Sequence, residues 1–214
     1  MPVGVYRPPR NRARVPACTT GRYGSAVAGR VGPPLIFVDI DGVLIPLRSR
    51  PYAVRVGGHD DGPDQHGNPL LDRLDPADGD RLLALPGELV WASTWMAEAN
   101  EVVAPRIGLP ALPFVDWPDD DEEPPRGVHW KTKPLVRWAA GRPFVWLDDE
   151  ISDADRRWVA AQHPQPALLH RVDPDRGLTW IDLAAVSRWL DHRPGVPQRR
   201  GHHSPGGRYA AARW

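Results

Sequence analysis

The feature that most constrains the fold of this sequence is a short, continuous apolar run at residues 35–38 (LIFV), which follows two prolines and ends at Asp39. A strand that is apolar at every position has both faces buried, and such strands are typical of parallel sheets covered by helices on both sides. Two more runs have this form, at residues 89–92 (LVWA) and 144–147 (FVWL). The sequence therefore predicts a parallel sheet.

The segments between these runs complete the pattern. Apolar periodicity and Gly or Pro breakers predict helices over 78–85, 95–104, 132–140, 152–161 and 180–190, and shorter strands over 112–115 and 167–169. Ser152 and Thr179 are the expected N-caps of two of these helices. Strands that alternate with helices predict an α/β fold with a three-layer, doubly wound parallel sheet. In such sheets, ligands bind at the carboxyl ends of the strands.

The charges divide the chain into three parts. The net charge is zero, but residues 1–34 contain six arginines and residues 193–214 contain five, and neither segment has an acidic residue. The part between them therefore carries an excess of eleven negative charges. Low apolar content at both ends predicts a disordered basic N-terminal tail at 1–33, one domain at 34–192 and a disordered basic C-terminal tail at 193–214. Such tails are either solvated ends or docking segments for nucleic acid.

Polar residues follow three of the predicted strands where each strand ends. They are Asp39 and Asp41, then Ser93 and Thr94, then Asp148 and Asp149. Two carboxylates at positions i and i+2, followed by Gly42 in a tight turn, place two like charges at one strand tip, which is costly unless a cation is bound. Mg²⁺ prefers one or two carboxylates together with water and substrate phosphate. The pattern favours a magnesium site, although an Asp-Gly turn alone is common.

These motifs resemble those of the haloacid-dehalogenase (HAD) superfamily over roughly residues 35–190. Residues 39–44 (DIDGVL) are similar to its first motif, and Ser93 after an apolar strand is similar to its second. Lys131 or Lys133 matches the third, and Asp148-Asp149 with Asp153 matches the fourth. Residues 91–95 (WASTW) and 146–150 (WLDDE) are similar to a group of small bacterial HAD-like proteins. Most members have no assigned substrate, and some related domains are linked to RNA-repair proteins.

Three of the motif assignments have an alternative within the sequence. The family pattern favours Ser93 over Thr94 as the phosphate ligand. Pro134 restricts the backbone of Lys133, which favours Lys131 for the third motif. For the metal ligand the family pattern favours Asp149, whereas Asp148 and Asp153 could serve only the start of the following helix.

The resemblance implies a Mg²⁺-dependent phosphohydrolase, a phosphatase that acts through an aspartyl-phosphate. In that interpretation Asp39 is the nucleophile, and Asp41 protonates the leaving oxygen and then activates water. The metal is held by the Asp39 carboxylate, the Asp41 backbone carbonyl and Asp149. Ser93 and Lys131 hold the phosphoryl oxygens. A non-catalytic phosphate- or metal-binding HAD module is the alternative.

The space between the motifs limits the substrate-binding part of the domain. The segment between the first two motifs is mostly loop, which predicts a minimal cap, with a small flap over residues 52–68. An open site favours larger phosphorylated substrates, nucleic-acid ends among them. One cysteine and no apolar run of about 18 residues favour a cytoplasmic protein without a membrane span. The tryptophans are expected mainly in the core rather than in a base-stacking platform. His59, His66 and His129 lack metal-ligand spacing.

Overall fold

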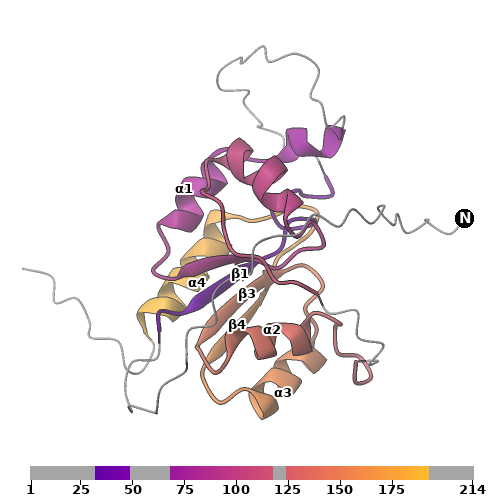
Figure 1. Cartoon of the computed structure of the whole chain (residues 1–214), viewed down its shortest axis with the longest axis vertical. Helices are drawn as coiled ribbons and strands as arrows, with labels where there is room; N and C mark the ends of the chain where they lie inside the picture. Colours follow the sequence, from indigo (N-terminus) through magenta and orange to yellow (C-terminus); the bar gives the residue numbers. More distant parts are fainter. Residues whose placement is uncertain (1–31, 49–67, 118–123, 193–214) are drawn as a thin grey trace, which may run out of the picture. The chain divides into compact units, whose positions relative to one another are not determined.

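A parallel sheet organises the domain. The computed structural model describes residues 32–48, 68–117 and 124–192. Four parallel strands, β1 (Leu35–Val38), β2 (Glu88–Trp91), β3 (Phe144–Asp148) and β4 (Ala167–Arg171), pair in the order β2-β1-β3-β4 (Figure 1). The central strand β1 is fully buried, as its unbroken apolar sequence requires. The predicted α/β fold is therefore confirmed.

Helices cover both faces of the sheet. The helices are α1 (Ala77–Leu83), α2 (Thr132–Ala139), α3 (Asp153–Gln162) and α4 (Trp180–Asp191). Successive strand residues point to opposite faces. Ile36 and Val38 belong to a core cluster with residues of α1 and α4, while Leu35 and Phe37 belong to a second cluster with residues of α2 and α3 (Figure 1). These are the three layers of a doubly wound sheet.

Two helix starts carry the cap residues expected from the sequence. Ser152 caps α3 and Thr179 caps α4, and each forms a capping box with the aspartate three residues later. In each box the cap hydroxyl accepts a hydrogen bond from that aspartate's backbone N–H, and the aspartate carboxylate accepts one from the cap residue's backbone N–H. These caps satisfy backbone donors that the first helical turn leaves free.

The prediction of one continuous helix at 95–104 is wrong. The chain turns after Ser93, then forms a π-helical turn, η2 (Ala99–Val103), and a 3₁₀ turn, η3 (Ala104–Ile107). Pro105 was expected to end the helix, but it lies in the first turn of η3, where proline's missing N–H costs no hydrogen bond. The segment ends instead at Gly108, whose φ is 73°.

The predicted strand at 112–115 is reduced to a single parallel bridge between Phe114 and Trp91. The N–H of Trp91 donates to the carbonyl of Pro113, and the N–H of Val115 donates to the carbonyl of Trp91. Pro113 has no N–H, so the ladder does not extend. The Asn100 amide holds the start of this segment, because it donates to the Leu112 carbonyl at 2.8 Å and accepts from the Leu112 N–H at 2.8 Å.

Between β1 and β2 the described residues contain one short 3₁₀ helix, η1 (Pro69–Arg73), and α1. The predicted flap at 52–68 lies outside the described residues except for Asn68, which caps η1. The two basic tails also lie outside them, so the boundaries 1–33, 34–192 and 193–214 stay predictions. None of the helices in the described ranges has the length and apolarity needed to cross a bilayer.

Candidate functional site

The sheet register brings the first and fourth motifs together. Val38 of β1 lies opposite Leu147 of β3, so Asp39, which follows β1, and Asp148, the last residue of β3, lie at the same edge of the sheet. The Asp39 N–H donates to the Leu147 carbonyl at 3.0 Å. On the other side of β1, the N–H of Ala92 donates to the Val38 carbonyl at 2.8 Å, which places Ser93 at this edge too. These contacts build one site from three strand ends.

A buried lysine lies between two of these carboxylates. The Lys131 ammonium contacts Asp39 Oδ2 at 2.6 Å and Asp148 Oδ2 at 2.9 Å. Lys131 directly precedes α2, whereas Lys133 lies half-buried in the first turn of that helix. The sequence left both lysines as candidates for the third motif. The structure places the Lys131 ammonium against Asp39, the proposed nucleophile.

The titration of the site reflects burial first and the neighbouring charges second. Burial raises the pKa of Asp39 to about 7, an increase that the Lys131 charge opposes and the Asp148 charge adds to. Burial, followed by the Asp148 charge, also raises the pKa of Asp149. Although burial disfavours the Lys131 ammonium, Asp39 and Asp148 raise the pKa of Lys131 above its ordinary value, so it stays charged. An added cation would favour ionised Asp39 and Asp149.

The donor set fits a hard divalent cation. Asp39, Asp148 and Asp149 each offer a carboxylate oxygen, and these oxygens lie within 4.8 Å of one another. Gly42, at a φ of 73°, makes room for this cluster, because a Cβ on it would lie 2.5 Å from Asp149 Cγ. Carboxylate oxygens are the ligands that Mg²⁺ prefers. The residues therefore fit the magnesium site expected from the first and fourth motifs, with Asp148 as an additional carboxylate.

We expect Gly42→Ala to weaken Mg²⁺ binding at least ~10-fold, because the new methyl group displaces the Asp149 carboxylate. Gly108→Ala is the matched control: Gly108 has the same φ of 73°, but a Cβ on it meets no atom within 4 Å. Both variants carry the backbone strain of about 1 kcal/mol, and only the first has the clash. Isothermal titration with Mg²⁺ measures the difference. Equal affinities in the two variants would contradict a role for Asp149 in holding the ion.

Asp41 lies apart from the carboxylate cluster. It is exposed, and its Oδ2 accepts a hydrogen bond from the Trp95 indole N–H at 2.9 Å. Among the described residues the carboxylates that could hold an ion together are those of Asp39, Asp148 and Asp149, so a contribution of Asp41 to an ion would rest on its backbone carbonyl, as the family pattern implies. The Trp95 hydrogen bond gives the Asp41 side chain a fixed direction.

Ser93 presents an unsatisfied polar atom. Its side chain is 1% exposed, and its Oγ has no hydrogen-bond partner among the described residues. The Ser93 carbonyl accepts from the Trp117 indole N–H at 3.0 Å, which fixes the backbone at this position. Thr94, the alternative in the sequence, is exposed. A buried hydroxyl without a partner is costly unless a ligand or water satisfies it, so Ser93 fits a ligand with acceptor oxygens.

Asp155 connects the segment around Lys131 to the loop after β3 through hydrogen bonds. The Asp155 carboxylate accepts from the His129 N–H at 2.7 Å, the Thr132 hydroxyl at 2.6 Å, and the Ser152 N–H and hydroxyl at 2.8 and 2.6 Å. Although burial alone would raise it, these hydrogen bonds hold the pKa of Asp155 below its ordinary value. Asp155 thereby holds the His129 backbone and the Thr132 side chain, which lie on either side of Lys131.

Asp153, the fourth-motif candidate, lies away from these contacts. Its side chain is 84% exposed and forms an ion pair with Arg156 at 3.0 Å. The alternative that Asp148 only caps the following helix is not what the structure contains, since Ser152 is the cap and Asp148 contacts Lys131. The sequence reasoning missed the placement of Asp148, Asp155 and Trp95. The spacing of Ser152 and Asp155 in a capping box was the available signal for Asp155.

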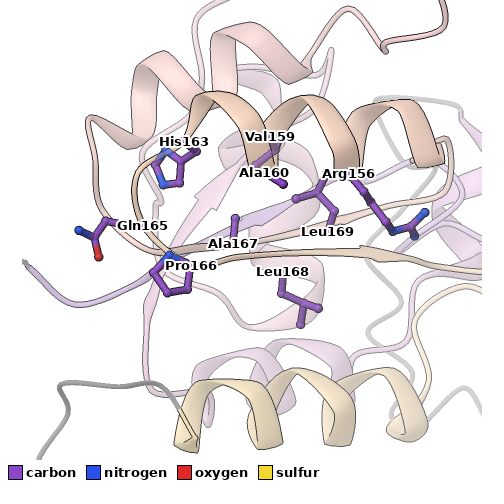
Figure 2. Close-up of a pocket in the computed structure, with 9 residues that line it drawn as sticks. All are labelled: Arg156, Val159, Ala160, His163, Gln165, Pro166, Ala167, Leu168 and Leu169. Atoms are coloured by element: carbon purple, nitrogen blue, oxygen red, sulfur yellow. The ribbon is translucent and has the colours of Figure 1, made fainter.

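A cavity of about 370 Å³ lies elsewhere, between α3 and the strand β4 (Figure 2). Its lining is mainly apolar, with Val159, Ala167 and Leu169 among the residues drawn there. None of the carboxylates described above lines it. The chemistry-bearing side chains therefore converge at the carboxyl ends of the strands and not at this cavity.

Comparison with known families agrees with this arrangement. Residues 35–183 match the family model described as "HAD domain in Swiss Army Knife RNA repair proteins". No curated protein and no solved structure matches the chain at a significant level. The match covers all four strands and every candidate site residue, and it extends over more than half of the chain. The chain therefore belongs to this family of HAD domains.

Proposed function

We propose that this chain is a Mg²⁺-dependent phosphohydrolase that acts through an aspartyl-phosphate on Asp39. One observation carries the proposal: a buried lysine bridges Asp39 and Asp148 at the sheet edge where Ser93 has a buried hydroxyl without a partner among the described residues. A phosphoryl group would supply the acceptor oxygens that Ser93 and Lys131 are placed to bind. Membership in a HAD family supports the same class of chemistry.

The first half-reaction uses Asp39 and Asp41. A carboxylate oxygen of Asp39 attacks phosphorus, the bond from phosphorus to the ester oxygen breaks, and Asp41 donates a proton to that leaving oxygen. The Trp95 hydrogen bond at 2.9 Å orients the Asp41 carboxylate for this transfer. The products are the free alcohol and a phosphoryl group bonded to Asp39.

The second half-reaction regenerates Asp39. The Asp41 carboxylate, now ionised, takes a proton from a water molecule that attacks phosphorus, and the bond between phosphorus and the Asp39 oxygen breaks. Lys131 and Ser93 hold the phosphoryl oxygens through both steps, which stabilises the charge of each transition state. Inorganic phosphate leaves, and Asp39 is a free carboxylate again.

Asp39, Asp149 and the Asp41 backbone carbonyl would hold Mg²⁺, with Asp148 beside them. When bound, the ion neutralises the charge between the attacking carboxylate and the phosphoryl oxygens. The carboxylate oxygens of Asp39, Asp148 and Asp149, which lie within 4.8 Å of one another, support this assignment. Burial raises the pKa values of Asp39 and Asp149, and a bound cation would favour their ionised forms.

A hydrolysis panel tests the proposed function. The full chain is incubated with sugar phosphates, mononucleotides, and oligonucleotides phosphorylated at the 5′ or 3′ end, with Mg²⁺ or with EDTA. We expect phosphate release from at least one class in Mg²⁺ and its loss in EDTA. Release of equal size in EDTA would overturn the metal dependence. Binding of phosphorylated ligands without release of phosphate would instead indicate the non-catalytic module.

Nucleic-acid ends are the substrate class that the family description favours, since its members are domains of RNA repair proteins. The basic segments at 1–34 and 193–214, with eleven arginines and no acids, suit contact with phosphate backbones. Deletion of residues 1–33 and 194–214 should lower nucleic-acid affinity and reduce its salt dependence. Unchanged affinity would assign nucleic-acid binding to the domain alone.

A further inference from the structure

Three tryptophans from different loops contact the candidate site. The Trp95 indole donates to the Asp41 carboxylate, and the Trp117 indole donates to the Ser93 carbonyl. The Lys131 ammonium lies 5.8 Å from the centre of the Trp130 ring. By contrast, Trp91 and Trp146 are fully buried in the core, as the sequence led us to expect for most tryptophans. The expectation of a core role is wrong for Trp130, and also for Trp180, which is 74% exposed.

Trp130 exposes a large apolar surface beside a polar site. It is 42% exposed, although it directly precedes the buried Lys131. Its ring packs edge to face against Trp117, with centroids 4.9 Å apart and an angle of 72° between the rings. His129 approaches the same ring at 5.5 Å. These contacts hold Trp130 in place while leaving part of its ring open to solvent.

The aromatic pair lies within one nucleotide of the proposed nucleophile. Lys131 Nζ is 2.6 Å from Asp39 Oδ2 and 5.8 Å from the Trp130 ring centre, so one side chain links the reaction centre to the aromatic surface. The Trp117 indole N–H donates a hydrogen bond to the backbone carbonyl of Ser93, whose hydroxyl is the proposed phosphate ligand. In a nucleotide a single sugar separates the phosphate from the base. A phosphate at Asp39 and Ser93 therefore brings a terminal base within reach of this pair.

We propose that Trp117 and Trp130 form a base-stacking subsite, and that the substrate is a nucleic-acid end whose terminal base stacks there while its phosphate lies at Asp39. This inference rests on the proposed function and names the substrate class of the same site. Indole rings stack on any base, because every base has a π-face, so the subsite accepts ends of different sequence. A sugar phosphate without a base cannot use it.

The test compares two oligonucleotides that carry the same terminal phosphate. In one the terminal residue has a base, and in the other it is abasic. We expect Trp130→Ala to lower kcat/KM for the first by ~10-fold, mainly through KM, because base–aromatic stacking is lost. The abasic substrate should lose less than ~2-fold. Trp130→Phe should retain most of the wild-type preference, because phenylalanine still offers an aromatic face.

Trp180→Ala is the matched control, since Trp180 is 74% exposed at the start of α4 and takes part in none of the site contacts described above. It should change neither substrate. An equal loss on both substrates in Trp130→Ala would overturn the subsite, because it would mean that Trp130 acts only through Lys131. If Trp130→Ala kept the wild-type preference for the base-bearing oligonucleotide over the abasic one, that result would overturn the subsite as well.

A binding measurement separates this inference from the proposed function. If the wild-type chain releases no phosphate from any substrate, the hydrolase proposal fails, and equilibrium binding of the two oligonucleotides to the same full chain decides the subsite. Tighter binding of the base-bearing end, lost in Trp130→Ala, supports stacking. Equal binding of the two oligonucleotides to the wild type overturns it.

Discussion

Asp39→Asn should reduce phosphate release by roughly 10⁴-fold or more, because the amide is a poor nucleophile and cannot form the aspartyl-phosphate. The fold should survive the change. Lys131 keeps its 2.9 Å contact with Asp148, and an asparagine oxygen can still accept from the Ile40 N–H, as Asp39 Oδ1 does at 2.8 Å. The measurement is initial-rate phosphate release in Mg²⁺ on the best substrate of the panel.

Asp153→Asn is the control for this variant. It removes one carboxylate from the first turn of α3, but Asp153 is 84% exposed and pairs only with the surface residue Arg156 among the ion pairs described above. We expect wild-type turnover and a stability change of less than about 1 kcal/mol. Wild-type turnover in Asp39→Asn would refute the assignment of Asp39 as the nucleophile. A large loss of phosphate release in Asp153→Asn would show that Asp153 contributes to the site.

Lys131→Met should have the largest effect on stability. It removes the buried positive charge between Asp39 and Asp148 and leaves two carboxylates close together without compensation. Breaking a buried ion pair in this way costs roughly 3–5 kcal/mol of unfolding free energy. Turnover should also fall sharply, because the phosphoryl oxygens lose a charged donor. Urea denaturation in EDTA measures the first effect.

Mg²⁺ gives this prediction a second readout. Because a cation bound to the same carboxylates replaces part of the missing charge, Mg²⁺ should stabilise Lys131→Met more than it stabilises the wild type. Lys133→Met is the control, since Lys133 is half-buried in the first turn of α2, where the same change leaves the Lys131 contacts intact. Equal stabilisation of Lys131→Met and wild type by Mg²⁺ would contradict a shared site.

Local patterns in the sequence were enough to predict the fold class and several element boundaries. Leu35–Val38 forms β1 at the predicted residues, because a short run that follows two prolines and is apolar at every position favours a strand buried on both faces. The capped helices α3 and α4 begin where Ser152 and Thr179 indicated. The segment after Ser93 was less predictable, because the hydrogen bonds of Asn100 to Leu112 and Trp91 join residues whose proximity no local pattern encodes.

The roles of the aspartates and lysines required the tertiary structure. The acidic pair at 148–149 was visible in the sequence. Nothing in that pair indicated that Asp148 contacts Lys131, which lies 17 residues earlier. In the sequence, only the restriction that Pro134 places on the Lys133 backbone distinguished Lys131 from Lys133. In the folded chain the Lys131 ammonium is buried against Asp39. Contacts between distant residues depend on strand order and helix placement, which periodicity does not specify.

By itself the sequence determined that buried strands are followed by polar residues, Asp39, Ser93 and Asp149 among them, since apolar runs and the polar residues after them are local properties. The tertiary structure decided which side chains meet there. The order β2-β1-β3-β4 places the first motif between the second and the fourth, and the Asp155 hydrogen bonds bring the Lys131 segment onto them. It also decided that Trp130 stays exposed beside the site. Burial and charge pairing are properties of the packed chain, so only the folded arrangement supplies them.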